Sequence, residues 1–114
     1  ASQLSQTDAT WKFVVFHFPP YTSEELYPDI VKHWVPLFDK YRVDMVMSGH
    51  FHYYLRTLPM KDSQPVGAGD LGTRYVMSVS TRGKNEDSPA EPYAEKVFKD
   101  GYLYQHVELN GRRL

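Results

Sequence analysis

The sequence contains no cysteine, which excludes disulfide bridges and metal sites built on thiolates and leaves the redox compartment undetermined. It also lacks any block of like charges, because 13 basic and 14 acidic residues give a formal net charge of −1. There is therefore no nucleic-acid-binding patch and no electrostatic support for a membrane-surface partner. No apolar run approaches the roughly 20 residues of a membrane span.

The first ten residues, ASQLSQTDAT, are polar and lack the basic start and apolar middle of a signal peptide. We expect residues 1–10 to be a disordered or linker-like start and residues 11–114 to form the folded unit. Hydrophobic residues make up 41% of the chain, including nine tyrosines and six phenylalanines, which is enough for a core and argues against overall disorder.

The hydrophobic pattern predicts an α/β fold with a mixed sheet. Residues 11–18, WKFVVFHF, are rich in β-branched and aromatic side chains and predict a buried strand, and so do residues 43–49, VDMVMSG. Apolar residues recur at helical spacing between them, over residues 22–42. Pro36 within that span predicts two short helices or one kinked helix. The strand–helix–strand order predicts that the two strands are parallel neighbours.

The second half of the chain predicts shorter elements. Residues 61–72 are rich in Gly, Pro and Asp and predict a loop, whereas residues 73–81 alternate as a third strand. A long polar loop follows over residues 82–96. Residues 101–114 alternate again and predict a last strand, with Asn110-Gly111 as a hairpin turn signal.

Two histidines separated by one residue follow the second predicted strand. Residues two apart in a strand face the same side, so His50 and His52 would converge if the chain stays extended. His17 ends the first strand, and ligands of open α/β sheets gather beyond the carboxyl ends of strands. Three neutral imidazoles at one edge predict a transition-metal site. Many histidine pairs at this spacing bind nothing, so structural roles stay open, and we expect such roles for His33 and His106.

The stretch GHFHYYLRT, residues 49–57, resembles the GHxH signature of the calcineurin-like metallophosphoesterases, most of all their purple acid phosphatase branch. In that branch an aromatic residue, a further residue and Arg follow the signature. Three more stretches are similar to the same branch and occur in the same order: WKFVVFHFPPYTS, HWVPLFDKYRVDMVMSGHFH and GTRYVMSVSTRG. The resemblance covers nearly the whole chain from Trp11 onward.

This resemblance implies a fold, a reaction and a site. The fold would be the C-terminal portion of a two-sheet sandwich with flanking helices, completed by a missing N-terminal half. The reaction would be hydrolysis of phosphate esters by metal-bound hydroxide at a dinuclear centre of Fe, Zn or Mn. His17 and His50 would bind one metal and His52 the other. Arg56, which matches the signature arginine, and Tyr21 would be the candidates for substrate contact.

The sequence also departs from the family pattern. The remaining ligands of the family are carboxylates, an Asn and, in the purple branch, a Tyr, and their motifs are missing here; GDLG at residues 69–72 imitates one of them but follows GHxH. We therefore expect the isolated chain to be inactive and to hold one metal ion or none. The alternative is a non-catalytic interaction module that binds no metal. A secreted or periplasmic location is favoured by the resemblance only.

Overall fold

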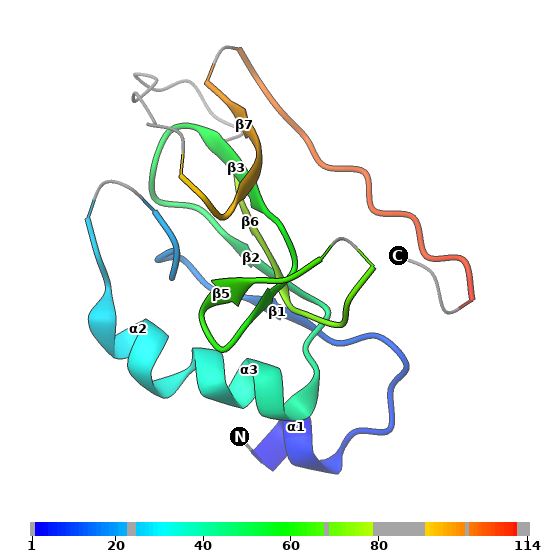
Figure 1. Ribbon diagram of the computed structural model, residues 1–114. Coiled ribbons are helices and arrows are strands. Elements are labelled where there is room, and N and C mark those ends of the chain that lie inside the picture. The colour runs from blue at the N-terminus through cyan, green and yellow to red at the C-terminus, as the bar shows by residue number, and fades with distance from the viewer. Residues whose placement is uncertain (1, 23–24, 68, 79–90, 100, 112–114) are drawn as a thin grey trace.

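The computed structural model describes residues 2–22, 25–67, 69–78, 91–99 and 101–111. A five-stranded mixed sheet and a small two-stranded sheet are combined with three short helices, so the mixed α/β class is confirmed (Figure 1). The elements in chain order are α1 (Ser2–Gln6), β1 (Phe13–Val15), α2 (Pro28–His33), α3 (Val35–Tyr41), β2 (Met45–Ser48), β3 (Tyr54–Thr57), β4 (Met60–Lys61), β5 (Gln64–Pro65), β6 (Arg74–Met77) and β7 (Ala94–Phe98).

The strands of the large sheet lie in the order β1-β2-β6-β3-β7. β1, β2 and β6 are parallel, whereas β3 is antiparallel to both of its neighbours, β6 and β7. The predicted parallel pairing of the first two strands is thus confirmed, and β6 lies inside the range of the predicted third strand. Because the three parallel strands run the same way, their carboxyl ends share one edge of the sheet.

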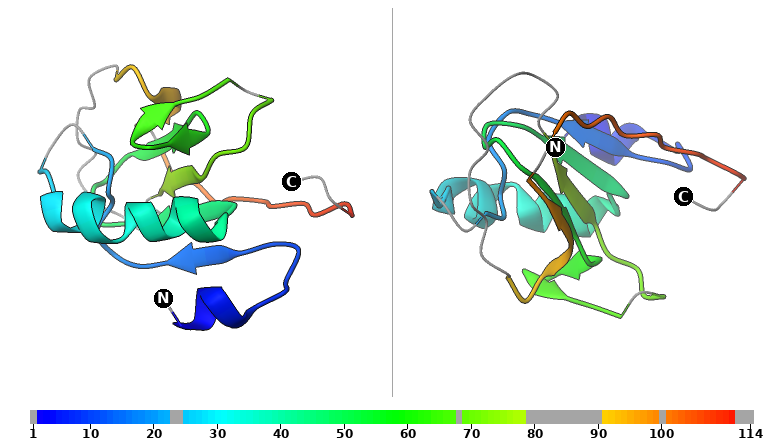
Figure 2. Two further views of the ribbon diagram at one scale, coloured as in Figure 1. Left: turned by 60° about the horizontal axis from the view of Figure 1, so that its bottom comes forward. Right: turned by 90° about the horizontal axis from the view of Figure 1, so that it is seen from above.

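Two helices, α2 and α3, run end to end along one face of the sheet (Figure 2). Pro28 and Pro36 each lie in the first turn of a helix, where the missing N–H costs nothing. Of the two predicted arrangements, two short helices or one kinked helix, the structure has the first, with Pro36 near the start of the second helix. α3 ends at Arg42, whose φ of 52° places it in the left-handed conformation common at helix ends.

Two apolar clusters fill the interior. The buried members of the first come from α3, β2, β4, β6 and the connection between α3 and β2, and are Val35, Phe38, Val43, Val46, Met60 and Tyr75. Leu4 of α1 packs against this cluster, so the first residues form a short docked helix where the sequence predicted a linker-like start. The buried members of the second cluster are Phe51, Tyr53, Leu55 and Met77.

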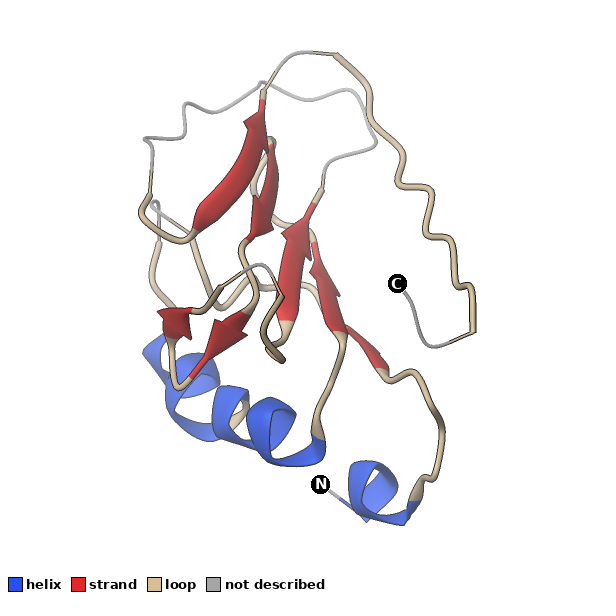
Figure 3. Ribbon diagram, turned by 45° about the vertical axis from the view of Figure 1, so that its right-hand side comes forward, coloured by secondary structure: helices blue, strands red, loops and turns tan. Residues whose placement is uncertain are grey.

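The C-terminal part of the chain differs from the prediction. β7 forms at Ala94–Phe98, which overlaps the end of the predicted polar loop; residues 82–90 of that loop lie outside the described residues. Residues 101–109 form no strand and run beside the sheet as a loop (Figure 3). A cavity of about 560 Å³ lies between part of this segment and the sheet face that carries Met45 and Met47. Alternation of apolar and polar residues predicts only an extended chain, whereas a strand also needs hydrogen bonds to a neighbouring strand.

The small hairpin of β4 and β5 is turned by Asp62 and Ser63, with φ values of 52° and 60°. Two successive positive φ angles are typical of a type I′ turn, which matches the twist of the paired strands. The hairpin is tied to α3, because the backbone N–H of Asp62 donates to Oδ2 of Asp39 at 3.0 Å. Within the described part of the chain, none of the helices has the length and apolar character needed to cross a bilayer.

Candidate functional site

Two histidines leave the sheet side by side at the carboxyl ends of β1 and β2. His17 lies two residues beyond β1, and His50 lies two residues beyond β2. Backbone hydrogen bonds continue the parallel ladder past both strands: the N–H of Phe16 donates to the carbonyl of Met47 at 3.1 Å, and that of Gly49 to the carbonyl of His17 at 3.0 Å. The sheet therefore fixes the separation between the backbones of the two histidines.

The imidazoles of these histidines face each other. Nε2 of His17 lies 3.1 Å from Nδ1 of His50, and the two ring planes are 84° apart. Imidazole nitrogens bind Zn²⁺ at about 2.0–2.1 Å, so two nitrogens at this separation fit one ion. Both lone pairs would then have to be free, which requires the ring protons to be on Nδ1 of His17 and Nε2 of His50.

His52 does not complete a three-imidazole site. In the described ranges, no group of three or more His, Cys, Asp or Glu side chains is placed to hold a metal ion. The sequence argument required an extended chain from His50 to His52, but His50 has a φ of 78° and the chain bends there. A left-handed residue breaks the two-residue alternation, so the argument for convergence does not hold at His50, and the assignment of His52 to a metal stays a prediction.

Aromatic rings surround His50. The centroids of Phe18 and Phe51 each lie 4.8 Å from that of His50, and Tyr27 lies at 5.9 Å. The hydroxyl of Tyr27 donates to Oε2 of Glu25 at 2.9 Å. Partial burial raises the pKa of Tyr27, and the hydrogen bond to Glu25 adds to this, so Tyr27 stays neutral. We call Phe18, Tyr27 and Phe51 the aromatic rim; the sequence analysis did not single it out, although FHF at residues 16–18 could have signalled it.

Tyr21, a predicted substrate contact, packs inward. Its ring lies 4.7 Å from that of Tyr75 and 5.6 Å from that of Tyr93, and it covers the first core cluster. Burial raises the pKa of the Tyr21 hydroxyl. These contacts make Tyr21 part of the core.

Arg56, the other predicted substrate contact, pairs with a carboxylate across the sheet. Its Nε donates to Oε2 of Glu95 at 2.8 Å, and Nη1 of Arg74 donates to the same oxygen at 2.6 Å. Arg74 also donates to the carbonyl of Thr57 at 3.3 Å. The cluster joins β3, β6 and β7, which is a structural role for Arg56.

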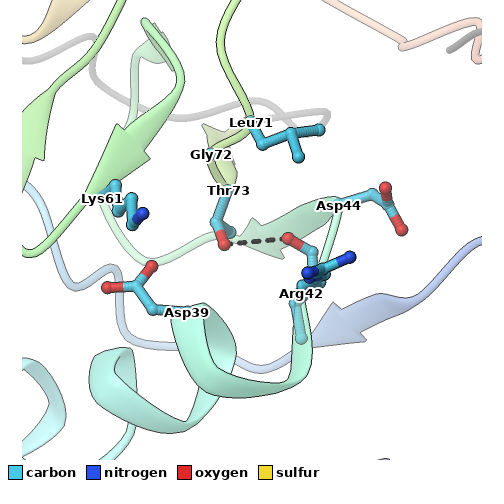
Figure 4. Close-up of a pocket in the computed structure, with 8 residues that line it drawn as sticks. Asp39, Arg42, Asp44, Lys61, Leu71, Gly72 and Thr73 are labelled. Carbon is cyan, nitrogen blue, oxygen red and sulfur yellow. Dashed lines mark hydrogen bonds between the residues drawn. The ribbon is translucent and has the colours of Figure 1, made fainter.

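A charged cavity of about 180 Å³ lies at the opposite edge of the sheet, where β2 and β6 begin (Figure 4). The charged side chains that line it are Asp39, Arg42, Asp44 and Lys61. Several polar groups here serve the backbone. The hydroxyl of Thr73 donates to the carbonyl of Val43 at 2.8 Å, and Oδ2 of Asp44 accepts from the N–H of Lys12 at 2.8 Å.

Asp70, in the GDLG stretch that imitates a family motif, is also used locally. Its carboxylate accepts from the N–H of Gly67 at 3.0 Å, and its own N–H donates to the carbonyl of Gly67 at 2.8 Å. Asp70 thus closes its own surface loop.

Three comparisons with known proteins found a family model, two relatives and a solved structure that this chain resembles. Residues 2–54 match the model of the calcineurin-like phosphoesterase family. Uncharacterized proteins of two Mycobacterium tuberculosis strains, CDC 1551 and H37Rv, are each 42% identical over 59 residues, which is 52% of this chain and 10% of theirs. The chain thus spans about a tenth of the length of these curated relatives. A purple acid phosphatase from yellow lupin (Lupinus luteus) seeds has the same fold over 87% of this chain and 21% of its own, with a TM-score of 0.66 and 23% identity.

Proposed function

We propose, from the premise that this chain carries part of a calcineurin-like metallophosphoesterase domain, that it supplies the histidine side of a dinuclear centre for hydrolysis of phosphate esters. His17 and His50 hold one metal ion together, and His52 serves the second. The chain corresponds to the C-terminal portion of the two-sheet domain. The carboxylates that such a centre needs come from the rest of a longer protein.

The contact between Nε2 of His17 and Nδ1 of His50 carries this proposal. Both nitrogens lie at the carboxyl edge of the parallel strands, where ligands of such sheets collect, and the shared backbone ladder keeps them together. Metal ions bound at such a centre would activate water and draw charge from the phosphoryl oxygens. The role of the two imidazoles is to fix one ion and leave its other positions open.

The isolated chain is inactive under this proposal. Two dications at close range repel each other by roughly several kcal/mol, and a bridging carboxylate is what offsets that repulsion. The described residues offer no group of three acidic or histidine side chains around the imidazole pair. We therefore expect one weakly bound metal ion and no turnover of 4-nitrophenyl phosphate by these 114 residues.

Isothermal titration of the chain with Zn²⁺ or Mn²⁺ tests the proposal. We expect one binding event that His17→Ala and His50→Ala each weaken at least about tenfold, because a single imidazole remains. His33→Ala is the matched control, since His33 is an exposed histidine at the end of α2, and it should bind as the wild type does. Equal loss in all three variants would sink the proposal.

A non-catalytic interaction module is the second candidate. It is favoured by the hydrogen-bonding distance between the two imidazoles and by the lack of a three-ligand cluster in the part of the chain described. This alternative expects no heat of binding from the wild-type chain with either metal. The same titration therefore separates the two functions.

A further inference from the structure

We propose that Phe18, supported by Tyr27, forms a recognition surface for an aromatic ring on the alcohol side of the phosphate ester, so that aryl phosphate esters are the preferred substrate class. This inference rests on the proposed function, because it needs a phosphoryl group held beside His17 and His50. It adds a specificity determinant that the two imidazoles do not provide.

The position of Phe18 carries the argument. Its ring centroid lies 5.0 Å from that of His17 and 4.8 Å from that of His50. Any ester whose phosphoryl group sits at the paired nitrogens therefore places its organic group within reach of the Phe18 ring. The side chain is 42% exposed, which leaves ring surface free for a partner.

Phe18 is also held in place before any ligand arrives. It is followed by two buried prolines, Pro19 and Pro20, whose fixed φ angles restrict the backbone. Its ring rests against that of Tyr27, with centroids 5.0 Å apart. A rigid aromatic side chain loses little conformational freedom when it binds, so it favours recognition by stacking.

The charges near the aromatic rim favour recognition of the organic group. The rings that contact Phe18 are those of His17, Tyr27 and His50. Among the described residues, the rim is bonded to one ionised acid, Glu25, through Tyr27. An acid repels a phosphate dianion, so binding energy from a stacked ring, which is worth roughly a factor of ten per base in single-stranded nucleic-acid complexes, would decide which esters bind.

The test measures binding of two unreactive probes, phenylphosphonate and methylphosphonate, to the full-length protein with its metal ions, by isothermal titration. We expect the wild type to bind phenylphosphonate about five- to tenfold tighter. Phe18→Leu should remove most of that preference, because it should weaken the binding of phenylphosphonate far more than that of methylphosphonate. Phe98→Leu is the matched control, because Phe98 is also 42% exposed but lies on β7, and it should keep the preference.

Each other outcome overturns the inference in a distinguishable way. Equal weakening of both probes by Phe18→Leu would mean that Phe18 only supports the imidazoles. A phenyl preference that survives Phe18→Leu, or a wild type that binds both probes equally, would mean that Phe18 does not recognise the aromatic ring of the ligand. If the wild type binds neither probe, the proposed phosphoesterase function fails and the recognition surface fails with it.

Discussion

The two edges of the central sheet carry polar side chains in opposite ways. At the amino edge, carboxylates and a hydroxyl are bonded to the backbone: Asp44 to Lys12, and Thr73 to Val43. At the carboxyl edge, His17 and His50 bond to each other and touch aromatic rings. The polar groups of the first edge stabilise the fold. The two imidazoles of the second edge can give up their mutual hydrogen bond and bind a ligand instead.

The comparison shows why a cavity is weaker evidence for function than polar side chains that hold no backbone group in place. The lining of the charged cavity of about 180 Å³ at the amino edge includes Asp39, Asp44 and Thr73, whose side chains already bond to the backbone. The imidazole pair lies at a surface that is half-buried or exposed. Buried backbone N–H and C=O groups need hydrogen-bond partners, so a side chain that serves as such a partner is needed for the structure.

The largest expected effect is the difference in stability between alanine variants of two glycines, one at each edge of the sheet. A Cβ on Gly72, at the amino edge, would lie 2.8 Å from the carbonyl oxygen and 2.9 Å from the nitrogen of Met60. That backbone cannot retreat easily, because Met60 and Thr73 exchange two hydrogen bonds of 2.9 Å. Gly72→Ala should therefore reduce the free energy of unfolding by about 1–3 kcal/mol, measured by urea denaturation.

Gly49→Ala, at the carboxyl edge, is the matched variant. Its Cβ would meet Nδ1 of His17 at 3.8 Å and the carbonyl of Ser78 at 3.9 Å, which are ordinary contacts. We expect stability within about 0.5 kcal/mol of the wild type, or slightly higher. Equal destabilisation by both alanines would break the comparison between the edges.

A smaller effect is expected at His50, which carries backbone strain. Its φ of 78° costs an L-residue roughly 1–2 kcal/mol, whereas glycine pays roughly 0.5–1 kcal/mol in backbone entropy. His50→Gly should thus be more stable than His50→Ala by up to about 1 kcal/mol, the reverse of the usual order. Thermal unfolding of both variants measures this, and a more stable alanine variant would show that the bend relaxes.

The smallest effect concerns Asp39 at the amino edge. Burial raises the pKa of this carboxyl, although the hydrogen bond from Asp62 opposes the shift. The folded chain therefore holds the proton more tightly than the unfolded chain, and the wild type loses stability as the pH rises through the raised pKa. Asp39→Asn keeps the acceptor oxygen and lacks the titration.

Melting temperatures from about pH 3.5 to about pH 7 check this expectation. Relative to the wild type, Asp39→Asn should be more stable at the upper end of that range than at the lower end. A constant difference across the range would show that the Asp39 carboxyl is as well solvated in the folded chain as in the unfolded one.

The sequence predicted the elements whose signals are local. Pro36 marked the start of α3, and β-branched runs marked β1 and β2, whose parallel pairing follows from the helices between them. Since that pairing aligns carboxyl ends, the proximity of His17 and His50 followed as well. These features depend on patterns that a few neighbouring residues determine.

The features that the sequence did not predict depend on partners or on single torsion angles. β7 has the sequence AEKVF, with two adjacent charged residues, and forms because β3 offers it a free edge, whereas residues 101–109 alternate well but pair with no described strand. The left-handed conformation of His50 was not predicted, because residues other than glycine rarely adopt a positive φ. One torsion angle at His50 thus removes the two-residue alternation on which the predicted convergence of His50 and His52 depended.

The hydrogen bond from the Gly49 amide to the His17 carbonyl has a consequence for motion. Solvent deuterium can reach that amide only when the two chain segments separate, so its exchange rate reports how often the backbone of Gly49 moves away from that of His17. Fluctuations that bend the sheet edge carry both rings along together. The spacing between the two nitrogens is therefore more constant than the position of either one.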